Sequence, residues 1–110
     1  MKSRVHMAVD AEEDILAIWR YVAHVDSVGR ADRLIDELRT SCLSLSAFPD
    51  RGHLPPELER IGIGEFREIH CKPYRIIYRL VEGDVFVHCV LDGRRDLQLL
   101  LVERAIRPRF

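Results

Sequence analysis

The change of hydrophobic period halfway along the chain is the feature that most limits its fold. Between residues 11 and 45 apolar side chains recur every three or four positions, which is typical of amphipathic helices. Between residues 66 and 91 they alternate or form short β-branched runs, which is typical of strands. Helices grouped before strands predict an α+β fold, with a helical hairpin packed on an antiparallel sheet.

Two helices are expected in the first half. The first begins near Ala11, because Asp10 and Glu13 have the spacing of a capping box. Its apolar stripe comprises Ile15, Ile18, Trp19 and Val22. The second follows a cap at Asp26 or Ser27, and its stripe comprises Ala31, Leu34, Ile35, Leu38, Cys42 and Leu45. The short connection predicts an antiparallel hairpin whose two stripes need an apolar surface to cover.

The second half predicts a meander of three strands, at residues 66–71, 74–81 and 85–91, after an irregular surface loop at 54–64. The inner face carries Tyr74, Ile76, Tyr78 and Leu80, and the outer face carries Arg75, Ile77 and Arg79. A short strand at residues 3–9 is expected before the first helix. After a turn at Asp92-Gly93, Asp96 caps a last helical segment containing Leu97, Leu100, Leu101 and Ile106.

Length and composition indicate one domain, residues 1–110, in the cytoplasm. A chain of 110 residues, 47% of them hydrophobic, has enough material for one core. No apolar run approaches the ~20 residues of a membrane span, and no signal-like stretch follows the first methionine. Three cysteines, without a C-x-x-C pair, suit reduced core thiols.

The charge distribution argues against direct recognition of nucleic acid. The first 60 residues carry 8 basic and 11 acidic side chains, whereas residues 61–110 carry 9 and 7. Non-specific affinity for nucleic acid grows with the number of cations presented, so this small excess gives little attraction to phosphates. We therefore expect no sequence-specific nucleic-acid binding by this chain alone.

Motifs for catalysis, cofactors and metals are missing from the sequence. There is no nucleophile elbow and no phosphate-binding loop, so neither a catalytic residue nor a cofactor is expected. His70-Cys71 and His88-Cys89 form a suggestive pair of dipeptides. If the strand at 74–81 lies between them, they are two strand spacings apart, about 9 to 10 Å, too far to share a zinc ion. We therefore expect no metal site.

An arginine cluster remains as the candidate functional feature. It comprises Arg67, Arg75, Arg79, Arg94 and Arg95, on strands expected to be neighbours. Arginine binds carboxylates and phosphates through two parallel hydrogen bonds, so such a face suits an acidic partner segment. Trp19 and Leu38 of the hairpin are expected to supply the apolar part of the surface. The alternative is that these arginines only solvate the outer face, with Arg94 or Arg95 paired to Asp92 or Asp96.

Several short motifs, in this order, resemble the ParE branch of the RelE/ParE toxin superfamily. They are Ala11 to Ile15, Phe48-Pro49-Asp50-Arg51-Gly52, Pro55-Pro56-Glu57-Leu58, Phe66-Arg67-Glu68-Ile69, Tyr74-Arg75-Ile76-Ile77-Tyr78-Arg79 and Asp92-Gly93-Arg94-Arg95-Asp96. The resemblance covers nearly the whole chain and implies a helical hairpin on an antiparallel sheet.

The same resemblance implies a toxin of a type II toxin–antitoxin module. ParE-like members inhibit DNA gyrase without an active site and are neutralised by a ParD-like antitoxin, and this is the reading we favour. The first alternative is a RelE-like endoribonuclease that cuts mRNA on the ribosome. Residues 97–110 contain no Tyr, His or Lys, so the proton-transfer groups for that chemistry are incomplete. The second alternative is a protein-binding module of the same fold without toxicity.

Overall fold

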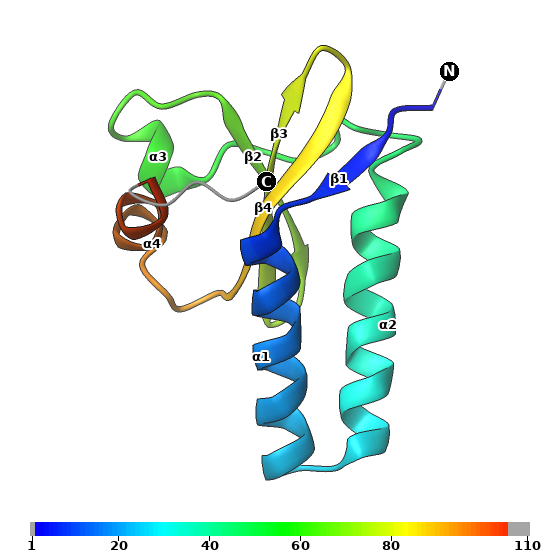
Figure 1. Ribbon diagram of the computed structural model, residues 1–110. Coiled ribbons are helices and arrows are strands. Elements are labelled where there is room, and N and C mark those ends of the chain that lie inside the picture. Colours follow the sequence, from blue (N-terminus) through cyan, green and yellow to red (C-terminus); the bar gives the residue numbers. More distant parts are fainter. Residues whose placement is uncertain (1, 106–110) are drawn as a thin grey trace.

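The computed structural model describes residues 2–105, and Figure 1 shows its elements. In chain order they are β1 (Val5–Met7), α1 (Val9–Val25), α2 (Val28–Ser44), α3 (Pro56–Glu59), β2 (Phe66–Cys71), β3 (Tyr74–Val81), β4 (Asp84–Asp92) and α4 (Leu97–Ala105). The architecture is α+β, as the change of period predicted. No helix in this part of the chain is long and apolar enough to cross a membrane. Ile106, expected in the last helix, lies outside the described residues.

The helical hairpin forms as predicted, but the first helix begins differently. Ala8 occupies its N-cap position, without a side-chain hydrogen bond, so the predicted capping box of Asp10 and Glu13 is wrong. The helix begins early because the chain leaves β1 without a loop, and the Ala8 amide still bonds to Val87 in the sheet. The second helix has the predicted cap, since the Ser27 hydroxyl accepts a hydrogen bond from the Arg30 amide.

The sheet has the strand order β1-β4-β3-β2. The meander of β2, β3 and β4 is antiparallel, as predicted, and β1 pairs parallel to β4 at one edge. Glu82 and Gly83, both with positive φ, form the tight turn between β3 and β4. The register shifts between Ile77 and Tyr78, where His88 is the extra residue on β4.

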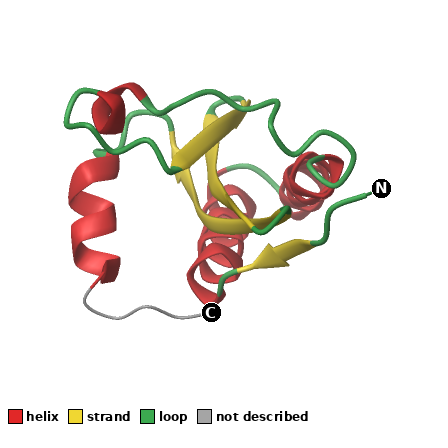
Figure 2. Cartoon of the chain, turned by 90° about the horizontal axis from the view of Figure 1, so that it is seen from above, coloured by secondary structure: helices red, strands yellow, loops and turns green. Residues whose placement is uncertain are grey.

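Each face of the sheet is covered by a different pair of helices (Figure 2). The hairpin covers one face, over a core that includes Ile15, Leu38, Ile76 and Tyr78. On the other face Leu58 of α3 and Leu97 and Leu100 of α4 pack on Ile77, Cys89 and Leu91. The outer face was expected to be exposed, either to a partner or to solvent, and this expectation is wrong because α3 and α4 pack on it. Sequence reading missed α3, which is a single turn inside the predicted loop.

Asp14 of α1 fastens the C-terminal helix to the rest of the fold. Its carboxylate accepts hydrogen bonds of 2.6 and 2.8 Å from the Arg104 guanidinium of α4. It also accepts one of 2.9 Å from the Val90 amide of β4. Both partners of the ion pair are largely buried, with 12 and 14% of their side chains exposed. This contact links α1, β4 and α4. It therefore holds α4 against the face of the sheet opposite the hairpin, called the second face below.

Candidate functional site

Arg75 lies at the centre of an ion-pair network on the face covered by α3 and α4. Its Nε and Nη2 donate to the two carboxylate oxygens of Glu68, at 2.9 and 2.8 Å. Its Nη1 and Nη2 donate to the carboxylate of Glu57 in α3, at 2.8 and 2.7 Å. Glu68 is 1% exposed and Arg75 is 8% exposed, so both charges are withdrawn from water. Such burial is tolerated because each charge is paired and hydrogen-bonded.

The network shifts the pKa values of all three groups. The hydrogen bonds that Arg75 donates lower the pKa of Glu57, and the same bonds, accepted by Glu57 and Glu68, raise the pKa of Arg75. Burial pushes the pKa of Glu68 upward, but hydrogen bonds from Arg75 and His70 outweigh it, and the net direction is downward. All three groups are therefore charged at neutral pH, and the network joins β2, β3 and α3.

The sequence suggested one exposed cluster of five arginines, but the structure separates them. Arg67 lies on the hairpin face of β2, opposite Tyr78, and donates hydrogen bonds to the carbonyls of Asp50 and Gly52. Arg75 is buried in its ion pairs, and Arg79 pairs with Glu65. Arg94 is 92% exposed beside Asp92, which is the pairing that the alternative foresaw, and Arg95 is exposed. Arg79, Arg94 and Arg95 remain accessible to a partner.

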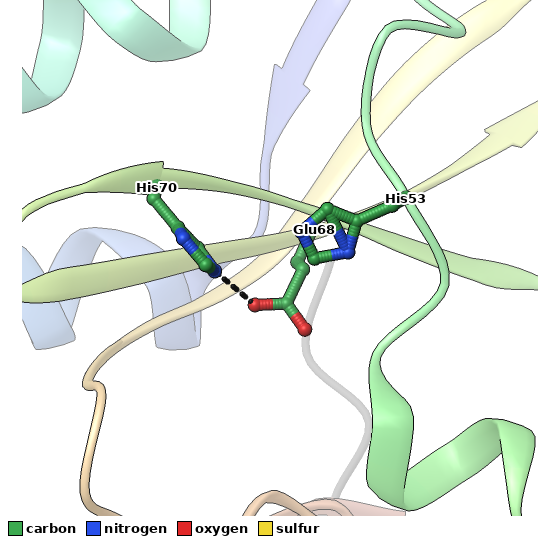
Figure 3. A group of neighbouring side chains, drawn as sticks. All are labelled: His53, Glu68 and His70. Carbon is green, nitrogen blue, oxygen red and sulfur yellow. Dashed lines mark hydrogen bonds and ion pairs between the residues drawn. The ribbon is translucent and has the colours of Figure 1, made fainter.

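Two histidines flank the buried Glu68 carboxylate, and the sequence analysis did not predict that they lie close together. His70 follows Glu68 by two residues on β2, and its Nε2 lies 2.7 Å from Glu68 Oε1. His53 comes from the segment before α3, with its ring centroid 5.3 Å from that of His70. Figure 3 shows the His70 ring pointing at the carboxylate and the His53 ring beside it. The two histidines are 17 residues apart and share no motif, so only the sheet geometry unites them.

An open cavity of about 330 Å³ lies over these side chains. Its lining includes His53, Glu57, Arg60, Glu68, His70, Lys72 and Arg75. Both histidines, Arg60 and Lys72 are exposed, whereas Glu68 and Arg75 form part of the buried floor. The cavity therefore brings two imidazoles and two exposed cations together above a buried ion pair.

A larger, apolar groove of about 660 Å³ lies along the hairpin and next to β1. Its lining residues are Met7, Val9, Glu12, Glu13, Ile15, Leu16, Trp19, Ile35 and Arg39. Trp19 is half-buried there and donates a hydrogen bond from its indole Nε1 to Asp32, at 2.8 Å. Leu38, the other expected contact residue, is fully buried in the core. Of these two hairpin residues, only Trp19 is therefore within reach of a partner.

The geometry of the fold agrees with solved toxin structures. The fold matches that of a chain of the chromosomal ParDE system from P. aeruginosa, with a TM-score of 0.69 and 12% identity, covering 83% of this chain and 96% of that one. It matches a chain of the toxin–antitoxin complex RelBE2 from Mycobacterium tuberculosis with a TM-score of 0.63 and 17% identity, covering 84 and 92%. At these identities the likeness defines the fold class, that of the RelE/ParE toxins.

Sequence comparison gives the particular family. Residues 5–97 match the family described as the ParE toxin of the type II toxin–antitoxin system parDE. The chain is also 31% identical over 88 residues to Toxin ParE3 of Caulobacter vibrioides, covering 76% of this chain and 80% of that protein. The chain therefore belongs to the ParE toxin family, and the resemblance drawn from its short motifs is confirmed.

Proposed function

We propose that this chain inhibits DNA gyrase, blocks replication and growth, and is neutralised by a ParD-like antitoxin. The observation that carries the proposal is the match of residues 5–97 to the ParE toxin family. Gyrase binding needs a docking surface and no toxin active site, which suits a chain with no catalytic motif in its sequence. The chain would act in the cytoplasm, where gyrase and the antitoxin are found.

The hairpin groove is the surface that we assign to the antitoxin. Val9 and Leu16, lining the groove, are 43 and 46% exposed, so apolar surface is available for a partner to bury. A disordered antitoxin tail could fold on this groove as an amphipathic segment, with apolar side chains every three or four residues. Acidic residues of the antitoxin that extend beyond the groove would meet the accessible arginines, Arg79, Arg94 and Arg95, none of which lines it.

The antitoxin surface is tested by affinity measurements on single variants. Leu16→Ala and Trp19→Ala should weaken antitoxin binding roughly tenfold each, because buried apolar anchors commonly contribute more than 1 kcal/mol. Leu99→Ala is the matched control, since Leu99 is 59% exposed on α4, away from the groove. Unchanged affinity in the two groove variants, measured by isothermal titration calorimetry, would remove the groove from the interface.

The activity is tested by expressing the chain alone and together with a candidate antitoxin. Growth arrest relieved by the antitoxin, together with plasmid DNA cleavage and an SOS response, is the expected result. Normal growth without the antitoxin would instead favour a non-toxic binding module. The Arg94→Glu/Arg95→Glu variant should remain toxic but escape the antitoxin in part, if these arginines contact its acidic residues.

One observation keeps ribosome-dependent mRNA cleavage as a second candidate. The open cavity over Arg75 brings His53 and His70 together with the cations Arg60 and Lys72, none of which belongs to the C-terminal segment. The imidazole and amine groups that residues 97–110 lack are therefore present at this cavity. Codon-phased breaks in cellular mRNA, mapped by primer extension after expression, would support this candidate, and intact mRNA during growth arrest would exclude it.

A further inference from the structure

We propose that His53, Glu68 and His70 bind one divalent transition-metal ion, with Zn²⁺ as the matching chemistry. One ligand atom from each of the three side chains lies within 4.8 Å of the other two. Two imidazoles and one carboxylate form a ligand set that holds zinc with a fourth position open to water. The proposal does not depend on whether the chain's target is gyrase or the ribosome.

The backbone places the three side chains on one face of the sheet. Glu68 and His70 are two residues apart on β2, so their side chains share a face. His53 forms an antiparallel bridge with Glu68, with backbone hydrogen bonds of 3.1 and 2.7 Å in the two directions. Directly opposed residues also share a face. Strand geometry therefore places the three side chains next to one another on one face.

The segment that carries His53 is itself fixed to the sheet by its neighbour. The Gly52 amide donates a hydrogen bond of 3.0 Å to the Tyr78 hydroxyl. A Cβ on Gly52 would lie 2.6 Å from that hydroxyl oxygen and 2.8 Å from the Glu68 carbonyl oxygen. The segment can approach the sheet this closely only because residue 52 has no side chain. One imidazole is thus held beside β2 before any ion binds.

Small side-chain rotations would complete the coordination. Zinc lies about 2.0–2.2 Å from nitrogen and oxygen ligands, so tetrahedral donor atoms are about 3.3 Å apart. His70 Nε2 and Glu68 Oε1, now 2.7 Å apart, need to separate slightly, and His53 needs to move inward. Both histidines are exposed and free of core packing, while the buried Glu68 is the fixed ligand. The cavity of about 330 Å³ leaves room for coordinating water.

The charges around the cluster permit a cation despite Arg75. Each carboxylate oxygen has two lone pairs, and Arg75 uses one on each oxygen of Glu68. Arg75 is paired equally with Glu57, so the three groups together carry a net charge of −1. Arg60 and Lys72 also line the cavity, but they are exposed and screened by solvent. The bound ion would join the segment before α3 to β2 and to the ion-pair network.

The test is calorimetric titration of the untagged, chelator-treated full chain with Zn²⁺. We expect one ion per chain, together with a rise in Tm when Zn²⁺ is added. His53→Ala and His70→Ala should each weaken binding roughly tenfold or more, since loss of even a group that only orients a ligand costs 10- to 100-fold. The double variant should neither bind the ion nor show the rise in Tm.

Two controls test whether a thiol, or a histidine outside the site, binds the ion instead. His24→Ala removes an exposed histidine of α1 and should leave Zn²⁺ affinity unchanged. Cys71→Ser tests the neighbouring half-buried thiol and should also have no effect. The proposal is overturned if wild-type protein binds no Zn²⁺, if the double variant binds as tightly as wild type, or if either control variant loses the ion. Circular dichroism of each variant checks that the fold is retained.

Discussion

On the face of the sheet that meets the α1–α2 hairpin, the core consists mainly of aliphatic side chains. It also contains Ala8, Ala11, Cys42 and Tyr78. On the face that meets α3 and α4, a smaller apolar core lies beside the buried charges of Arg75 and Glu68. Apolar packing spreads its stabilisation over many contacts, whereas a buried ion pair depends on each partner being present. The second face should therefore depend on fewer residues, each with a specific partner.

Arg75→Met should give the largest loss of stability on the second face. Glu68 would stay buried without its counter-ion, and removing one partner of a buried pair costs about 3–5 kcal/mol. Urea denaturation of wild type and variant measures the difference. Arg79→Met is the matched control on the same strand, because Arg79 forms a more exposed pair with Glu65 and should change stability by less than about 1 kcal/mol. Equal losses in both variants would contradict the contrast between them.

Leu38→Ala probes the hairpin face and should cost about 3 kcal/mol, the usual scale for emptying a fully buried leucine site. The antitoxin affinity of the folded fraction should not change, because Leu38 is buried beneath the surface. Leu16→Ala should show the reverse pattern, with little loss of stability and weaker binding. Chemical denaturation and calorimetry, applied to both variants, separate a core residue from a contact residue. Weaker antitoxin binding by folded Leu38→Ala would show that the core position also shapes the groove.

His88 gives the second face a dependence on pH. Burial lowers the pKa of this histidine to about 4, and the nearby Arg79 acts in the same direction. An unfolded chain, with an ordinary pKa of about 6.5, binds the proton first, so stability falls as the pH drops from about 6.5 to 4. With the ring partly exposed, we expect a loss of about 1–2 kcal/mol. His88→Gln should flatten the profile in this window, measured by urea denaturation at several pH values. An unaltered profile would assign the loss to other groups.

The exposed pair between Arg39 and Glu12 should have the smallest effect. Its two hydrogen bonds of 3.0 and 3.1 Å join α2 to α1, but the side chains are 46 and 42% exposed. Surface pairs of this kind contribute about 0–1 kcal/mol. Arg39→Ala should therefore shift the urea midpoint only slightly, and high salt should remove the difference. A loss as large as that of Arg75→Met would show that hairpin packing depends on this pair.

Most of the fold could be predicted from the sequence, because hydrophobic period reports which face of an element is buried. The hairpin, the Ser27 cap, the meander and the Asp96 cap of α4, where its carboxylate accepts from the Leu99 amide, are confirmed. The start of α1 could not be predicted, because the chain passes directly from β1 into the helix. What covers the outer face was also hidden, since the period of a strand does not say which element packs on it.

The candidate site was less predictable, because charge type does not determine burial. Arg75 and Arg79 are four residues apart on the same strand, β3, yet Arg75 is buried and Arg79 is accessible. The difference arises from Glu57 in α3, a helix that the sequence did not indicate. The meeting of His53 with His70 likewise needs the bridge between His53 and Glu68. Both features depend on interactions between segments that are distant in the sequence. The residue pattern along one strand does not reveal such interactions.

The most direct measurement uses the purified wild-type chain in two parallel reactions, one with DNA gyrase and supercoiled plasmid and one with translating ribosomes. We predict trapped gyrase–DNA cleavage complexes, or loss of supercoiling, in the first reaction. In the second, the mRNA should remain intact. The antitoxin should abolish the gyrase effect. Ribosome-dependent cuts in the message, with gyrase activity unaffected, would contradict the assignment and favour mRNA cleavage as the chain's activity.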